Sequence, residues 1–229
     1  GRIIMYSDYN IRVSSQKNIY GEKFVLRLLK KNQNIKSLHD LGFPENIDIK
    51  DCFEKRNSVT IMGAPTGEGK TTSLYSIIND LNRTEVNITT IEDPVEIRIA
   101  GLNQVEMDSK TTFASSLRTI LRQDPDVILV GEIRDKETAE ISIQAGQTGH
   151  YVLSTIHTID AVEVITRLRK LGITNYDIAS TLATTASQRL VRRLCNHCKK
   201  EHIVNAQEAK DLCDIAEGTK VFEPCGCPH

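Results

Sequence analysis

The chain has 229 residues, enough for one large domain whose core needs no disulfide bonds. Its 29 Lys and Arg residues nearly balance 30 Asp and Glu residues, and a net charge of -1 gives no long-range field that would favour nucleic acid or an anionic membrane. Trp is absent and only 5% of the residues are aromatic, so the stacking surfaces that hold single-stranded nucleic acid are scarce, which counts against a helicase.

The N-terminal part of the chain contains short β-like runs separated by polar residues, among them Ile11–Val13 and Phe24–Leu29. A Lys- and Asn-rich stretch, Lys30–Lys36, is followed by Gly42-Phe43-Pro44 and is typical of a linker. We therefore predict that residues 1–40 are the end of a small N-terminal domain plus a linker, and that residues 41–229 form the main domain.

From Val59 onward, apolar strand patterns alternate with amphipathic helix patterns, which is typical of a parallel sheet covered by helices on both faces. The predicted strands are Val59–Met62, Asn87–Ile91, Val127–Val130 and Tyr151–Thr155. The predicted helices are Thr71–Leu81, Thr112–Arg122, Lys136–Ala145, Asp160–Leu171 and Asp177–Leu194. The sequence thus predicts an α/β fold.

A glycine-rich loop joins the first of these strands to the first helix and has the order of a Walker A motif. Its backbone N–H groups, the Lys70 ammonium and the Thr71 hydroxyl suit the phosphates and Mg²⁺ of a nucleotide. Two residues depart from the usual pattern: Ala64 replaces the first glycine, and Glu68 places a carboxylate in the loop. The predicted nucleotide-binding residues are Pro65, Thr66, Gly67, Glu68, Gly69, Lys70, Thr71 and Thr72.

Two further strands end in acidic residues. Glu132 follows the apolar run Val127–Val130, at the sheet edge where ligands of open α/β sheets bind, and is predicted to organise Mg²⁺ together with Thr71. Gly131 stands where many P-loop enzymes have Asp. Glu92 is the candidate general base that polarises the attacking water, the alternative being a carboxylate that caps the turn before Pro94.

Histidines flank the next strand, with His150 before it and His157 after it. A polar residue at the carboxyl end of such a strand can sense the γ-phosphate, which favours His157, whereas either ring can equally be a structural hydrogen-bonding group. Arg118 and Arg122 share a face of a predicted helix, and on local evidence they read as a solvated basic surface.

Four ordered motifs together resemble those of the type II secretion and type IV pilus-assembly ATPases. They are Ala64–Thr72, Thr90–Glu96, Leu121–Asp135 and Thr148–Thr158. The resemblance covers nearly the whole chain from about Asp8. It implies a RecA-like P-loop NTPase domain after a smaller α+β domain, and a homo-hexameric ring that hydrolyses ATP with Mg²⁺ between the two domains.

Such a ring drives pilin or pseudopilin assembly, in pili, type II secretion or competence, through a platform protein of the inner membrane. With no apolar run near the roughly 18 residues that span a bilayer, we expect a cytoplasmic chain, peripheral to the cytoplasmic face of that membrane and without direct nucleic-acid binding. The alternatives are a P-loop nucleic-acid translocase, and a degenerate nucleotide-binding scaffold that Ala64 and Glu68 suggest.

The resemblance also extends the set of candidate site residues. Thr90–Glu96 matches the family's aspartate box, Asp126–Glu132 its Walker B motif and Gly149–His157 its histidine box. Arg12 and Arg27 match arginines of the N-terminal domain that reach the nucleotide phosphates, and the resemblance implies a catalytic role for them. Further candidates around the nucleotide are Arg118, Arg122, Arg167 and His150.

Four cysteines near the C-terminal end form two close pairs, Cys195 with Cys198 and Cys225 with Cys227. In a reducing compartment this spacing indicates a structural zinc site rather than disulfides, so residues 195–229 are predicted to be a cysteine module. The second pair is C-x-C instead of C-x₂-C. The fourth ligand is therefore open between Cys225, His229 and a residue beyond.

Overall fold

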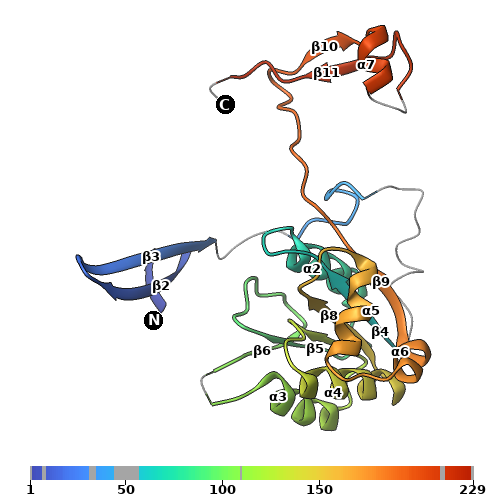
Figure 1. Ribbon diagram of the computed structural model, residues 1–229. Helices are drawn as coiled ribbons and strands as arrows, with labels where there is room; N and C mark the ends of the chain where they lie inside the picture. The colour runs from blue at the N-terminus through green and yellow to red at the C-terminus, as the bar shows by residue number, and fades with distance from the viewer. Residues whose placement is uncertain are drawn as a thin grey trace. The chain divides into compact units, whose positions relative to one another are not determined.

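The computed structural model describes residues 2–6, 9–30, 35–43, 57–108, 110–211 and 215–227. The chain divides into two compact units, Gly1–Arg189 and Leu190–His229 (Figure 1). The predicted domain boundary near residue 40 stays a prediction, and part of its linker lies outside the described residues. No helix among the described residues combines the length and apolarity needed to cross a membrane.

The first unit contains a six-stranded parallel sheet with the strand order β6-β5-β7-β8-β4-β9. Its four inner strands are buried along their whole length, as expected for a sheet that is covered on both faces. They are β4 (Ser58–Gly63), β5 (Ile88–Glu92), β7 (Val127–Val130) and β8 (Tyr151–Ile156), close to the predicted bounds.

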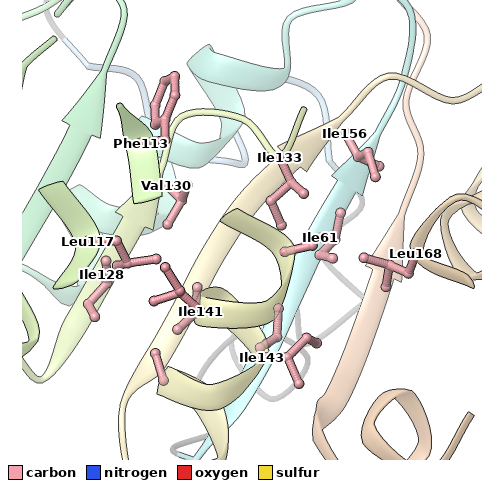
Figure 2. Close-up of a cluster of buried hydrophobic side chains, with 14 of the residues drawn as sticks. Ile61, Phe113, Leu117, Ile128, Val130, Ile133, Ile141, Ile143, Ile156 and Leu168 are labelled. Carbon is pink, nitrogen blue, oxygen red and sulfur yellow. The ribbon is translucent and has the colours of Figure 1, made fainter. Parts of the chain in front are cut away.

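Alternate residues of these strands enter two separate apolar clusters, one on each face of the sheet. Ile128 and Val130 belong to one cluster with side chains of α3 (Phe113–Ile120), α4 (Lys136–Gln147) and α5 (Ala161–Lys170), part of which Figure 2 shows. The neighbouring residues of β7 pack on the opposite face against α2 (Lys70–Leu81). A 3₁₀ turn, η1 (Leu121–Gln123), follows α3 directly.

The predicted helix Asp177–Leu194 is wrong. Only α6 (Asn175–Thr181) is helical, and Leu182–Ala186 forms the edge strand β9 beside β4. The segment carries two β-branched threonines, and its backbone hydrogen bonds to β4 replace those of a helix. The opposite edge strand, β6 (Asn103–Glu106), was not predicted either, because its short, polar and largely exposed sequence has no apolar pattern.

The N-terminal residues form an antiparallel sheet of three strands, β1 (Arg2–Tyr6), β2 (Tyr9–Asn18) and β3 (Gly21–Lys30). The sequence predicted β structure here. Arg12 and Arg27 are direct cross-strand partners, and both are exposed. Two like charges side by side on one face of a hairpin repel each other, which is tolerable at an exposed site and is relieved by an anion.

The second unit is small. It pairs β10 (Lys200–Ile203) with β11 (Lys220–Glu223), and the short helix α7 (Ala206–Asp211) lies between them in sequence. Lys199 sits over the ring of Phe222 at 4.8 Å. The His202 ring contacts the Glu208 carboxylate at 2.8 Å, which raises the pKa of His202.

Candidate active site at the carboxyl edge of the sheet

The loop between β4 and α2 has the backbone conformation of an anion-binding cradle. Gly67 and Gly69 adopt left-handed φ angles of 85° and 79°, a region that side chains disfavour, and Gly69 is the N-cap of α2. Alternating backbone conformations of this kind turn successive N–H groups toward one point. Gly63 is needed for a different reason: a Cβ there would lie 2.6 Å from a Val164 methyl group.

Lys70 is the first residue of α2 and its side chain lies inside this loop. Its ammonium donates to the carbonyl oxygens of Ala64 and, at 2.8 Å, Pro65. Burial lowers the pKa of Lys70, and the nearby Glu132 carboxylate counteracts part of that effect. The loop therefore holds a buried cation directly beside its converging N–H groups, which is the arrangement that a polyphosphate requires.

Glu132 lies at the end of β7, on the same sheet edge as the loop. One carboxylate oxygen forms an ion pair with Arg134, and the other lies 3.5 Å from His157 Nε2. Arg134 also lies 3.8 Å from the Asp93 carboxylate, and its bond to Glu132 raises the pKa of the guanidinium. Basic groups from two loops thus fix the orientation of the acid that faces Lys70.

Gly131 explains why one acid stands at this strand end where two are common. A Cβ on Gly131 would lie 2.9 Å from the carbonyl oxygen of Ile91 in the neighbouring strand. The Gly131 N–H donates to that same oxygen at 2.8 Å, so the strands are too close here for a side chain. The contact keeps Glu92 and Glu132 at adjacent strand ends.

Glu92 is buried, with 4% of its surface exposed, and three side chains donate to its oxygens. They are Tyr75 from α2, Thr90 at 2.6 Å and Gln104 from β6 at 3.3 Å. Burial and the Glu92 charge raise the pKa of the Tyr75 phenol, and burial likewise raises the pKa of Glu96. Glu92 is therefore a buried carboxylate whose hydrogen bonds are made within the protein, near the sheet edge that carries Glu132.

Four other candidate residues are not in contact with the glycine-rich loop of this chain. His150 directly precedes β8 at the opposite sheet edge, where its ring contacts the Ala145 carbonyl at 3.0 Å. Arg118 forms an exposed ion pair with Glu137 at 2.7 Å, and Arg122 lies in η1, which leads into the amino end of β7. Arg167 is exposed in the last turn of α5. His150 and Arg122 therefore lie at the amino edge of the sheet, opposite the loop, whereas Glu137, the partner of Arg118, is in the first turn of α4.

The sulfurs of Cys195, Cys198 and Cys227 all lie within 4.8 Å of one another, and two of them are 3.7 Å apart. Zn–S bonds of about 2.3 Å in a tetrahedron place sulfurs about 3.8 Å apart, so the spacing fits zinc. A backbone N–H from His197 lowers the pKa of Cys195, which favours the thiolate. Cys225, predicted as a ligand, is exposed and outside this group, and His229 lies outside the described residues.

Several residues of the site were not predicted. Arg134 lies two residues after Glu132, and an arginine this close to a strand-end acid was the available signal. The sequence around Tyr75 predicts a core residue on an apolar helix face, and nothing in it predicts the hydrogen-bond partner of the Tyr75 hydroxyl. Gln188 contacts the loop through Glu68, but it fell inside the helix that does not form.

The parallel sheet and the loop at its carboxyl edge define a RecA-like P-loop NTPase fold, so the predicted fold class is confirmed. Residues 1–229 match the family described as Type II/IV secretion system protein. The chain is 45% identical to the type II secretion system protein E of Klebsiella pneumoniae over 222 residues, covering 95% of this chain and 44% of that protein. It is 42% identical to the type IV pilus assembly ATPase PilB of Pseudomonas aeruginosa over 237 residues, covering 100% of this chain and 42% of that protein.

Solved structures agree with this assignment. The pilus retraction motor PilT with bound ADP superposes with a TM-score of 0.67 at 32% identity, covering 79% of this chain and 53% of that chain. The Legionella pneumophila ATPase DotB gives 0.66 at 25% identity, covering 77% and 51%. The chain belongs to the Type II/IV secretion system protein family, as its motifs predicted, and it spans less than half the length of the two curated relatives.

Proposed function

We propose that this chain is the ATP-hydrolysing core of a motor for pilus assembly or protein secretion. The observation that supports this most is the placement of the buried Lys70 ammonium inside a glycine loop, with Glu132 close enough to affect its pKa. Relatives described as a pilus assembly ATPase and as an ADP-bound motor agree with nucleotide hydrolysis at such a loop.

In the proposed reaction, a water oxygen bonds to the γ-phosphorus, the bond from that phosphorus to the β–γ bridging oxygen breaks, and the water proton leaves to a carboxylate or to the phosphate itself. Lys70 and the loop N–H groups neutralise charge on the β- and γ-oxygens. Thr71 and Glu132 would hold Mg²⁺, which supplies further charge neutralisation when bound.

The hydrogen bonds of Glu92 favour a supporting role for it, different from the general-base role that the sequence suggested. All three of its donors come from this chain, and only 4% of its surface is exposed. Glu132, oriented by Arg134 and His157, is the better placed acid to orient the water. A loose transition state needs an oriented water more than a strong base.

Assembly is part of the proposal. We expect a homo-hexamer at the cytoplasmic face of the inner membrane, bound to a platform protein. The exposed Arg12 and Arg27 pair then stabilises phosphate charge, and Arg118, Arg122, Arg167 and His150 serve subunit contacts or stay structural. The three clustered cysteines hold a structural Zn²⁺ together with a fourth protein ligand outside the group, because a thiolate site closed by four ligands leaves no position for a substrate.

Turnover of Glu132→Gln in size-resolved oligomers tests the proposal. We expect a loss of at least about 100-fold, because the neutral amide neither binds Mg²⁺ well nor accepts a proton. Glu140→Gln removes an exposed carboxylate on α4 and should leave turnover unchanged. Equal, near-zero rates for wild type and Glu132→Gln in intact rings would favour a nucleotide-binding scaffold, and stimulation of wild type by DNA or RNA would favour a translocase.

A further inference from the structure

Gln188 follows the edge strand β9 and contacts both ends of the phosphate-binding segment. Its side-chain N–H₂ donates to the Glu68 carbonyl oxygen at 2.5 Å. Its side-chain oxygen accepts from the Ser73 hydroxyl at 2.8 Å. A carbonyl oxygen can only accept, so the amide nitrogen must face Glu68, and the pair of partners fixes the orientation of the amide.

The contact with Glu68 controls a peptide group that the cradle uses. The Glu68 carbonyl and the Gly69 N–H belong to one planar trans peptide, so they point in opposite directions. Gln188 holds the carbonyl on the outer side of the loop, and the Gly69 N–H therefore points inward. Gly69 is one end of this peptide and Gly67 precedes Glu68, and both have left-handed backbones that glycine can leave at little cost, so an external restraint is needed to hold the peptide in one orientation.

The contact with Ser73 ties the same amide to the helix that carries the reactive side chains. Ser73 is buried, and its N–H donates to the Gly69 carbonyl at 3.1 Å in the first turn of α2. Lys70 and Thr71 lie between the two points that Gln188 holds. One side chain thus fixes the loop backbone relative to the start of the helix.

Gln188 is itself held by the sheet. Ala186, two residues before it, pairs with Met62 in β4, the strand that leads into the loop. Arg189, the next residue, donates to the carbonyl of Ile159 in the loop after β8. The residues on both sides of Gln188 are therefore held, Ala186 by backbone pairing with β4 and Arg189 by its guanidinium on the loop after β8.

We propose that Gln188 is a positioning residue for phosphate binding, which keeps the Gly69 N–H directed into the cradle through its bonds to Glu68 and Ser73. The inference rests on the proposed function, since it concerns the same nucleotide. The cradle contacts the phosphates before and during hydrolysis, so the loss of Gln188 weakens binding without changing the chemical step.

Gln188→Glu is the sharpest test, because it keeps the shape and the acceptor for Ser73 but removes the donor to Glu68. We expect the Kd of Mg·ADP, measured by calorimetry, and the KM for ATP to rise about three- to tenfold, the effect of one lost hydrogen bond, while kcat stays within about twofold. Gln188→Ala should match it. Ser73→Ala should give a smaller rise, because the bond to Glu68 remains.

Ser187→Ala is the matched control, since Ser187 is the adjacent, exposed residue and its hydroxyl accepts from Arg189 at 3.3 Å. It should bind Mg·ADP as wild type does. A wild type that binds no Mg·ADP overturns the proposed function. A wild type that binds while Gln188→Glu binds equally well, or loses kcat with an unchanged Kd, overturns the role of Gln188 alone. If Gln188→Ala does not fold, the isosteric Glu variant and Ser73→Ala carry the test.

Discussion

The sheet with the proposed nucleotide site at its carboxyl edge and the C-terminal unit are stabilised in different ways. Two apolar clusters enclose the sheet, and the strands that carry the site are buried along their length. In the C-terminal unit, Val204 is the one buried apolar side chain among the described residues. So little apolar burial contributes little stability to a unit this small, and on our proposal zinc bound by the cysteine group supplies most of the rest. The comparison teaches that the ATP site and the cysteine module can fail independently.

Removal of the proposed zinc should have the largest effect, because it should destabilise the C-terminal unit and leave the first unit folded. Cys195→Ser, or chelation of wild type, should unfold the C-terminal unit, because the remaining ligands hold zinc weakly and little else holds the unit. The measurements are zinc content and the rate of proteolysis after Arg192 and Arg193. Binding of Mg·ADP by the first unit should persist.

Cys225→Ser is the control for this experiment and also decides between the predicted ligands. Its thiol lies outside the group of three, so this variant should retain zinc and resist proteolysis. Loss of zinc in Cys225→Ser would restore Cys225 as a ligand. A Cys195→Ser chain as resistant as wild type would show that the unit does not depend on metal.

A smaller effect is expected in the first unit, where it tests whether buried hydrogen bonds contribute to stability. Tyr75→Phe keeps the buried ring but removes a donor to Glu92, and it should lower the free energy of unfolding by about 1 to 3 kcal/mol, the cost of a buried acceptor without its partner. Urea unfolding of the first unit measures it.

Tyr176→Phe is the matched control, because Tyr176 is exposed and should change stability by less than about 0.5 kcal/mol. Equal stability of Tyr75→Phe and Tyr176→Phe would mean that the bond to Glu92 contributes nothing to the core.

Much of the sheet could be predicted because its inner strands are uninterrupted apolar runs between helices with clear periodicity. Val127–Val130 matches its strand residue for residue. The edge strands were missed for a physical reason: β6 is polar, and β9 is specified by pairing with β4 rather than by its own composition. Tertiary pairing of this kind leaves no local pattern in the sequence.

The candidate site likewise has parts that local sequence patterns predict and parts that depend on distant contacts. The loop, Lys70 and Glu132 could be predicted because the Walker A spacing and an acid after an apolar strand are local sequence patterns. The partners of Glu92 and of Glu68 are distant in sequence, and no spacing rule connects Gln188 with a loop 120 residues earlier. The burial of Glu92 could not be predicted from the sequence either, although burial limits the access of water to this carboxylate.

Calorimetric titration of Mg·ADP into wild type and Lys70→Ala tests the central claim most directly. The account predicts saturable binding to wild type and at least about tenfold weaker binding to Lys70→Ala, because charge-assisted bonds to the phosphates are lost. Folded wild type that binds no nucleotide, or a Lys70→Ala variant that binds as tightly as wild type, would contradict it.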